Sequence, residues 1–339
     1  MDHNLLRQIF DDFSNVHALV IGDVMVDAYL YGQVDRISPE APVPVVSLTS
    51  RKNMLGGAAN VALNIKALGA SPLLFSVIGK DRKSQEFLEL MAKENLDTSG
   101  ILESQERITT TKFRIIGNKN QMLRVDEEIT SDLTPAIENL LFENISSVIR
   151  EKTIQVIVLQ DYNKGVLTKS LIEKVTGLAQ TRNIPVVVDP KKKNFETYRG
   201  VKLFKPNLKE LREGLKTNFH ASDKTSLIES IALLQENQQL EMVMVTLGDE
   251  GLVVRFKEHD QYKVDILAAH LRSISDVSGA GDTVISVAAI GVALGVEPYI
   301  MAFIANLAGG IVCEYSGVVP IDKDRLLREV LNIDIGGNV

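Results

Sequence analysis

The sequence predicts an α/β fold: a doubly wound, mostly parallel sheet with helices on both faces, and a small β-sheet lid. Short apolar runs recur along the chain, and helical segments lie between several of them. This alternation is typical of parallel strands that are buried on both faces. The apolar runs are Ala18–Ile21, Leu73–Ile78, Ile154–Leu159, Pro185–Val188, Val201–Phe204 and Met242–Leu247, and the helical segments are Ala58–Leu68, Gln85–Asn95, Ile137–Arg150, Ser170–Arg182 and Ser226–Glu236.

Two insertions, at about residues 28–48 and 109–125, interrupt this alternation and predict the lid. Their alternating apolar and polar residues suit a sheet with one exposed face. The expected strands are Tyr29–Val34, Val43–Leu48, Thr111–Ile116 and Gln121–Val125. Because an uncovered apolar sheet face is a liability in water, we expect the lid to cover a ligand or a second subunit. We therefore expect a single domain over residues 1–339 that carries these insertions.

Composition argues against several classes of function. The net charge of −7 argues against nucleic acid as the main partner. The only cysteine is Cys313, so the sequence offers no intrachain disulfide and no cysteine metal cluster, which fits a cytoplasmic protein. Neither a signal-peptide pattern nor an uninterrupted apolar stretch of about 18 residues is visible, so no membrane association is expected.

The strongest chemical signal is the segment Asp276–Asp282, which precedes an apolar helical run. A helix N-terminus offers free N–H groups and a positive dipole end, and therefore attracts phosphate. A carboxylate in such an anion site suggests proton transfer, so we interpret Asp282 as the base of a phosphoryl transfer to a hydroxyl. The anion hole is expected at the small residues of the turn, Gly279, Ala280 and Gly281.

Further polar residues follow the predicted strands, at the sheet edge where parallel sheets bind ligands. These residues are Asp23, Asp161, Asp189 and Asn207. Asp23 and Asp27 are a pair of acids that suits the vicinal hydroxyls of a sugar. The alternative is that Asp23 only caps the local backbone and Asp27 is solvated.

A second small-residue turn, Gly56 and Gly57, opens the helix that contains Asn60. Glycines let a polar ligand approach the main chain, and the Asn60 amide can donate to and accept from hydroxyls. The alternative is a tight helix entry without a ligand.

Asn207 and Glu210 have the spacing of a capping box, which is the structural interpretation of this pair. The functional alternative places them near the hydration shell of Mg²⁺, which keeps several waters and needs few carboxylates. Lys191, two residues after Asp189, either reaches nucleotide phosphates or belongs to a surface turn. The turn at Thr246, Gly248 and Gly251 is either a nucleotide ledge or an ordinary hairpin.

Several enzyme classes lack their motifs here. The sequence has no Gly-x-x-x-x-Gly-Lys-Ser/Thr loop and neither the His-Arg-Asp nor the Asp-Phe-Gly motif of protein kinases. No Gly-x-Gly-x-x-Gly follows the first expected strand, which argues against a dinucleotide oxidoreductase.

Together these motifs resemble the ribokinase-like (PfkB) family of small-molecule kinases over nearly the whole chain. Gly56–Asn60 resembles its N-terminal signature, Asp276–Asp282 its C-terminal signature, and Asn207 with Glu210 its magnesium and phosphate motif. Within the family, Arg36–Val45 resembles the lid segment of the D-glycero-β-D-manno-heptose-7-phosphate kinases. Four further segments of the chain agree with that subgroup: Gln121–Glu128, Asp161–Tyr162, Lys164–Gly165 and Asp189–Lys191.

The resemblance implies transfer of the ATP γ-phosphate to the anomeric hydroxyl of the heptose, with Mg²⁺ organised through water by Asn207 and Glu210. It also implies a homodimer formed through the lid. A monovalent cation stays an open alternative. Many members have threonine where this chain has Val277, which lacks the hydroxyl that would touch phosphate or a nearby monovalent cation. No His-x-Gly-His follows the kinase region, so we expect the nucleotidyl transfer of fused members to belong to another protein.

The expected ligand contacts fall into three groups. The sugar hydroxyls are assigned to Asp23, Asp27, Gly56, Gly57, Asn60 and Asp161. The 7-phosphate is assigned to lid cations, for which a solvated surface is the alternative: Arg36, Lys112, Arg114 and Arg124. The nucleotide is assigned, mainly through the resemblance, to Asp189, Lys191, Asn207, Thr246, Gly248, Gly251 and Asn306.

Two rival functions remain at this point. One is a kinase of another sugar or sugar acid, such as fructose, ribose or ketodeoxygluconate, against which only the Arg36–Val45 segment argues. The other is a catalytically silent protein that binds a sugar phosphate. Asp282 argues against the second, because a binding protein has no need of a base.

Overall fold

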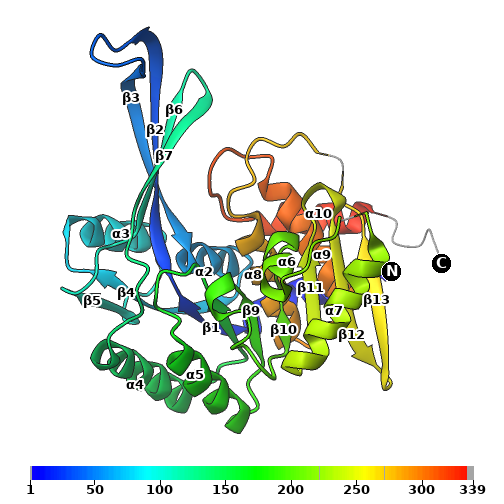
Figure 1. Ribbon diagram of the computed structural model, residues 1–339. Coiled ribbons are helices and arrows are strands. Elements are labelled where there is room, and N and C mark those ends of the chain that lie inside the picture. The colour runs from blue at the N-terminus through cyan, green and yellow to red at the C-terminus, as the bar shows by residue number, and fades with distance from the viewer. Residues whose placement is uncertain (1, 221, 271, 334–339) are drawn as a thin grey trace.

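The computed structural model describes residues 2–220, 222–270 and 272–333 and contains a nine-stranded central sheet (Figure 1). The strand order is β13-β12-β11-β10-β9-β8-β1-β4-β5. The sheet is parallel from β5 to β11, and β12 and β13 add antiparallel strands at one edge, which confirms the expected mostly parallel sheet. The strands are β1 (His17–Gly22), β4 (Ser71–Gly79), β5 (Ile101–Ser104), β8 (Val156–Gln160), β9 (Val186–Asp189), β10 (Leu203–Phe204), β11 (Met242–Thr246), β12 (Leu252–Glu258) and β13 (Gln261–Leu267).

Helices cover both faces of this sheet, because neighbouring residues of each buried strand point to opposite sides. Val20 belongs to one apolar cluster, whereas Leu19 and Ile21 belong to the other. The first cluster contains side chains of α1 (His3–Asp12), α2 (Ala58–Ala67), α3 (Arg82–Lys93), α8 (Ala280–Ala293), α9 (Pro298–Val312) and α10 (Lys323–Asn332). The second contains side chains of α4 (Pro135–Glu151), α5 (Lys169–Thr181), α6 (Leu208–Leu215) and α7 (Lys224–Gln238).

The second sheet has four strands in the order β3-β2-β6-β7 and rises from the body as a long ribbon (Figure 1). Its strands run farther than expected from the sequence: β2 (Val24–Ile37), β3 (Pro44–Gly57), β6 (Thr111–Gly117) and β7 (Asn120–Glu127). Only Asp23 separates β1 from β2, and β3 ends at Gly57, immediately before α2. β2 and β3 therefore continue from β1 and into α2 without a linker, whereas residues 105–110 and 128–134 connect β6 and β7 to the body.

Two contacts fix the start of α8 against α2. The Thr283 hydroxyl donates to the Asn64 side chain at 3.1 Å, and the Ser286 hydroxyl donates to the Val61 carbonyl at 3.2 Å. The Thr283 and Ser286 side chains are fully buried. The N-terminal turn of α8 thereby lies beside that of α2.

Among the described residues no helix combines the length and apolarity needed to cross a bilayer.

Candidate active site

Asp282 lies in the first turn of α8 and is 3% exposed. Three neutral donors from different segments hold its carboxylate. Asn60 Nδ2 donates to Oδ2 at 2.8 Å, while Gln160 Nε2 and the Tyr162 hydroxyl donate to Oδ1 at 3.1 and 2.7 Å. The predicted residues Asn60 and Asp282 are thus in direct contact, although 222 positions separate them in the sequence.

Burial raises the pKa of Asp282 to about 6, because the charged form loses its water. The hydrogen bonds from Asn60 and Tyr162 lower this pKa, nearby Asp189 raises it, and Lys205 lowers it. A carboxylate with a pKa near neutrality can accept a proton from a hydroxyl and release it again, as a general base requires.

Gly279 adopts the left-handed conformation (φ 83°) and is the N-cap residue of α8. The Ala280 amide donates to the Val277 carbonyl at 3.3 Å, so the amides of Gly281 and Asp282 are the better candidates for binding an anion at this helix start. A Cβ on the next glycine, Gly281, would lie 3.7 Å from Lys205 Nζ and 3.8 Å from an Asp189 oxygen. Lys205 and Asp189 form a buried ion pair, and the expected anion hole is therefore adjacent to it.

The interpretation of the sequence missed three residues of this cluster: Gln160, Tyr162 and Lys205. Lys205 is 2% exposed and pairs with Asp189 at 3.0 Å, and Gln160 Nε2 also donates to Asp189 at 3.2 Å. Each follows or ends a buried apolar strand, so a polar residue at the end of such a strand was the available signal. Of the three, only Gln160 is itself the last residue of its strand.

A cavity of about 370 Å³ opens next to the start of α8. The turn after β11 and the residues of α9 that face α8 form much of its wall. Five of the expected nucleotide residues line it together with Ala280 and Gly281: Asn207, Thr246, Gly248, Gly251 and Asn306. The structure thus gathers these residues around one cavity, and the turn after β11 also joins two antiparallel strands, as the hairpin alternative expects.

Asn207 and Glu210 form the capping box of α6. The Asn207 side chain accepts from the Glu210 amide at 2.9 Å, and the Glu210 carboxylate accepts from the Asn207 amide at 2.8 Å. The other Glu210 oxygen pairs with Lys191, so Lys191 belongs to this cluster and not to a free surface turn. Burial lowers the pKa of Lys191, but Asp189 and Glu210 outweigh it and raise the pKa overall.

The acid Asp27 is 4% exposed, which excludes the solvated alternative. It pairs with Arg114 at 2.9 Å, and Arg114 Nε donates to the Tyr29 hydroxyl at 3.2 Å. Burial raises the pKa of Asp27, while Arg114 and Lys112 lower it. A Cβ at position 56 would collide with the Asp27 carboxylate, which explains why glycine stands there.

The other expected lid cations divide into paired and exposed ones. Lys112 lies 3.3 Å from Asp126, and Arg124 Nε donates to the same carboxylate at 2.9 Å. Arg36 lies on an exposed part of β2, next to a register shift. Because intramolecular carboxylates already neutralise much of the charge of Lys112, Arg114 and Arg124, these three are weaker phosphate ligands than the sequence suggested.

Two acids that we expected at the sugar hydroxyls make internal contacts instead. Asp23 is 1% exposed and accepts from the amides of Tyr162, Lys164 and Val166 at 2.8, 3.0 and 3.0 Å. Asp161 is equally buried and accepts from the Asn163 amide, the Asn194 side chain and the Tyr198 hydroxyl. These contacts favour the structural alternative for Asp23.

A larger hollow, of about 810 Å³, lies between the lid and the segment that leads to α8. Lid residues such as Tyr29 and Lys119 form one side, and Ser275, Asp276 and Ser316 form the other. The sugar was expected between lid and body, as this hollow lies, but none of the residues that we assigned to the sugar or its phosphate lines it.

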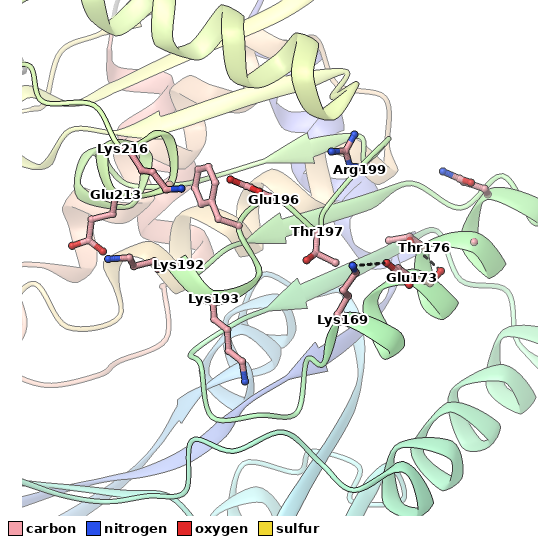
Figure 2. Close-up of a pocket in the computed structure, with 14 residues that line it drawn as sticks. Lys169, Glu173, Thr176, Lys192, Lys193, Glu196, Thr197, Arg199, Glu213 and Lys216 are labelled. Atoms are coloured by element: carbon pink, nitrogen blue, oxygen red, sulfur yellow. Dashed lines mark hydrogen bonds and ion pairs between the residues drawn. The ribbon is translucent and has the colours of Figure 1, made fainter.

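Another hollow, of about 700 Å³, lies over α5, α6 and the segment between β9 and β10 (Figure 2). Its walls mix both charges: Lys169, Lys192, Lys193, Arg199 and Lys216 with Glu173, Glu196 and Glu213. No residue of the lid or of α8 lines it, and none of the expected site residues does, so we assign it to neither substrate.

Comparison with known proteins identifies the family of this chain. Residues 16–324 match the model of the pfkB family carbohydrate kinases. The chain is 39% identical over 315 residues to a bifunctional protein HldE of Methylobacillus flagellatus, covering 93% of this chain and 63% of that protein. It is 35% identical to a bifunctional protein HldE of Trichlorobacter lovleyi, covering 97% and 66%. The chain thus spans about two thirds of the length of these relatives, or slightly less.

Solved structures share the fold at low sequence identity. Phosphofructokinase-2 from Escherichia coli in complex with potassium superposes with a TM-score of 0.77 at 17% identity, covering 93% of this chain and 99% of that one. Ribokinase from Arabidopsis thaliana gives 0.69 at 14% identity, covering 94% and 99%. The chain belongs to the pfkB family of carbohydrate kinases, enzymes that transfer a phosphoryl group to a sugar hydroxyl.

Proposed function

We propose that this kinase phosphorylates the anomeric hydroxyl of D-glycero-β-D-manno-heptose 7-phosphate with ATP, giving the 1,7-bisphosphate used in heptose and lipopolysaccharide-core precursor synthesis. The observation that carries the kinase chemistry is the position of Asp282. It lies at the start of α8, and the two residues before it, Ala280 and Gly281, line the proposed nucleotide cavity. It also contacts Asn60, which lies three residues after the end of the lid strand β3.

In the proposed mechanism, Asp282 accepts the proton of the sugar hydroxyl while the amides of Gly279 to Asp282 hold the charge of the phosphoryl group. A positioned general base contributes roughly 10²–10⁴ in rate. Each preorganised donor at a developing charge adds about 10²–10³. Lys205 and Lys191 lie near this anion site, where Asp189 and Glu210 already pair with them.

Mg²⁺ belongs to this proposal, and we place Asn207 and Glu210 near it. Both Glu210 oxygens already accept one hydrogen bond, but a carboxylate oxygen has a further lone pair for a water. Among the described residues no group of three acids, histidines or cysteines forms a metal cage. The remaining lone pairs of Glu210 fit an ion held through water, which would neutralise phosphate charge.

We expect Asp282→Asn to reduce kcat by at least about 10² while leaving ATP affinity nearly unchanged, because the amide cannot accept the proton. In the wild type, activity should fall as the pH drops through about 6, since the raised pKa protonates the base there. Steady-state kinetics and ATP titration calorimetry measure both effects. Near-normal turnover of the variant would disprove the assignment.

The sugar identity rests on the relatives and on the Arg36–Val45 segment. The aligned relatives are named bifunctional, and this chain covers only part of each. The heptose therefore comes to this chain by similarity of the aligned part. The alternative, a PfkB-type kinase of another sugar or sugar acid, shares the same Asp282 chemistry and differs only in the acceptor.

A coupled ADP-release assay distinguishes these acceptors. We expect the highest kcat/KM with heptose 7-phosphate, at least about tenfold above fructose 6-phosphate, because a site that pairs with a sugar's polar groups rejects poorly matched analogues. Fructose, ribose and ketodeoxygluconate complete the panel. A preference for an unphosphorylated sugar would transfer the assignment to the alternative.

For the 7-phosphate we favour Lys119 as the main ligand, and Arg36 remains a second candidate. Lys119 lines the lid-side hollow and is exposed, and none of the ion pairs among the described residues involves it. By contrast, removing Arg114 would leave the buried carboxylate of Asp27 without its partner, so its replacement does not isolate phosphate binding.

We expect Lys119→Met to raise KM for heptose 7-phosphate about tenfold and to leave KM for ATP within about twofold, because one charge-assisted contact is lost. Lys52→Met is the matched control, since Lys52 is an exposed lysine of the lid strand β3 that does not line the hollow. Equal changes for both substrates, or an equal effect of the control, would remove Lys119 from the site.

We also propose a cytoplasmic homodimer formed through the lid. Large apolar side chains are exposed along the lid: Ile37, Val43, Leu48, Leu123 and Val125. Pairing two lids would take these groups out of water. A single cysteine fits the reducing cytoplasm.

Sedimentation velocity at micromolar concentration is expected to show a dimer, and Leu123→Asp should convert it to monomer by placing a charge in the contact. Leu140→Asp, at an equally exposed leucine of α4, serves as the control. A wild-type protein that is monomeric under these conditions contradicts the proposed dimer.

A further inference from the structure

The segment 161–166, which follows β8, connects three roots of the lid to the proposed base. One end of the connection is the Tyr162 hydroxyl, which donates to Asp282 at 2.7 Å. The other end is the backbone of the same segment, which is bound at several points by residues at the roots of β2, β6 and β7. The function of Asp282 derived above does not require this connection, and the segment contributes no residue to the nucleotide cavity.

The root of β2 holds the segment through Asp23. The Asp23 carboxylate accepts from alternate amides, those of Tyr162, Lys164 and Val166. The residues between them have left-handed backbones, Asn163 at φ 55° and Gly165 at φ 88°. This alternation turns the three amides toward one side and makes a concave site for an anion, which a carboxylate of the protein itself fills here.

The roots of β6 and β7 hold the same segment. Arg107, four residues before β6, donates to the Lys164 carbonyl, to the Ser131 carbonyl at 2.7 Å and to the Ile129 carbonyl at 3.2 Å. Glu128 directly follows β7 and pairs with Lys164 Nζ at 2.6 Å.

We propose that segment 161–166 couples the lid to the base, with Tyr162 as the positioning residue that orients the carboxylate of Asp282. This inference rests on the proposed role of Asp282. A displacement of the lid roots moves the backbone of Tyr162, and the Tyr162 hydroxyl passes this movement to Oδ1 of Asp282 through its hydrogen bond. Lys191 Nζ also makes a cation–π contact with the Tyr162 ring, 5.3 Å from its centroid, and so connects the segment to a residue that we assigned to the nucleotide.

The electrostatic consequence can be measured. The groups that face Asp282 are Asn60, Gln160 and Tyr162 as donors, with Asp189, Lys191 and Lys205 as the charged neighbours. Burial and Asp282 raise the pKa of Tyr162 well above its usual value, so its hydroxyl stays a donor throughout the working pH range. This donor favours ionised Asp282, and its loss must raise the pKa of Asp282.

The test is the acid limb of the kcat profile in Tyr162→Phe. We expect its midpoint to move to higher pH by about one unit, which is a tenfold loss of the ionised fraction at low pH. Tyr262→Phe is the control, because Tyr262 lies on β13 against Arg255 and belongs neither to the cluster around Asp282 nor to segment 161–166. Its acid limb should stay in place. An unmoved limb in a folded Tyr162→Phe variant overturns the inference.

Should that variant fail to fold, site-specific 3-fluorotyrosine at position 162 keeps the shape and strengthens the donor, and the limb should then move to lower pH. No movement there overturns the inference as well. Asp282→Asn separates the two proposals: its activity would refute the base itself, whereas an inactive Asp282→Asn with an unmoved Tyr162→Phe limb refutes only the positioning role.

The lid connection is tested by Lys164→Met, which removes the ion pair with Glu128. We expect a smaller shift of the acid limb in the same direction and no additional shift when Lys164→Met is combined with Tyr162→Phe, because both act through one path. A shift that adds in full to that of Tyr162→Phe, or no shift in the single variant, overturns the coupling to the lid.

Discussion

The burial of one carboxylate, Asp282, at the start of α8 is the constraint on which the site depends. An ionised group that is 3% exposed is costly unless hydrogen bonds replace its water. The three neutral donors come from α2, the end of β8 and the segment after β8. The packing of α2 against α8 and the position of β8 in the sheet are thus required together. The same burial brings the pKa of this acid into the range that proton transfer needs.

Charge compensation follows the same logic around the site. Asp189 is matched by Lys205, Glu210 by Lys191 and Asp27 by Arg114. Each pair is partly or fully removed from water, so removing one member would leave a charge without a partner in a poorly solvated place. Cations that are already paired are poorly available to a ligand. This is why the lid residues that look most basic in the sequence are weaker candidates for phosphate than Lys119.

The main sheet, the lid and the loop before α8 could be predicted because their signals are local. Apolar runs, alternation and small-residue turns depend on near neighbours in the chain. For Gln160, Tyr162 and Lys205 the only local signal is a polar residue at or after the end of an apolar strand, because their roles arise only when strand ends far apart in sequence meet. The same limit explains Asp23: a strand-end acid looks like a ligand, and only the fold shows that three backbone amides already occupy it.

The absence of a linker between β1 and β2 constrains how this architecture can diversify. A single residue joins a strand of the core to a strand of the lid, and its backbone is itself bonded to Gln160 and Ala58. Extra residues at this junction would shift the register of both sheets at once. The hairpin ends near residues 38–43 and 118–119 lie outside the strands. The fold should therefore tolerate length variation and inserted reporter groups at the tips and reject them at the roots, and the tip at residues 38–43 is the better choice because the other tip carries Lys119.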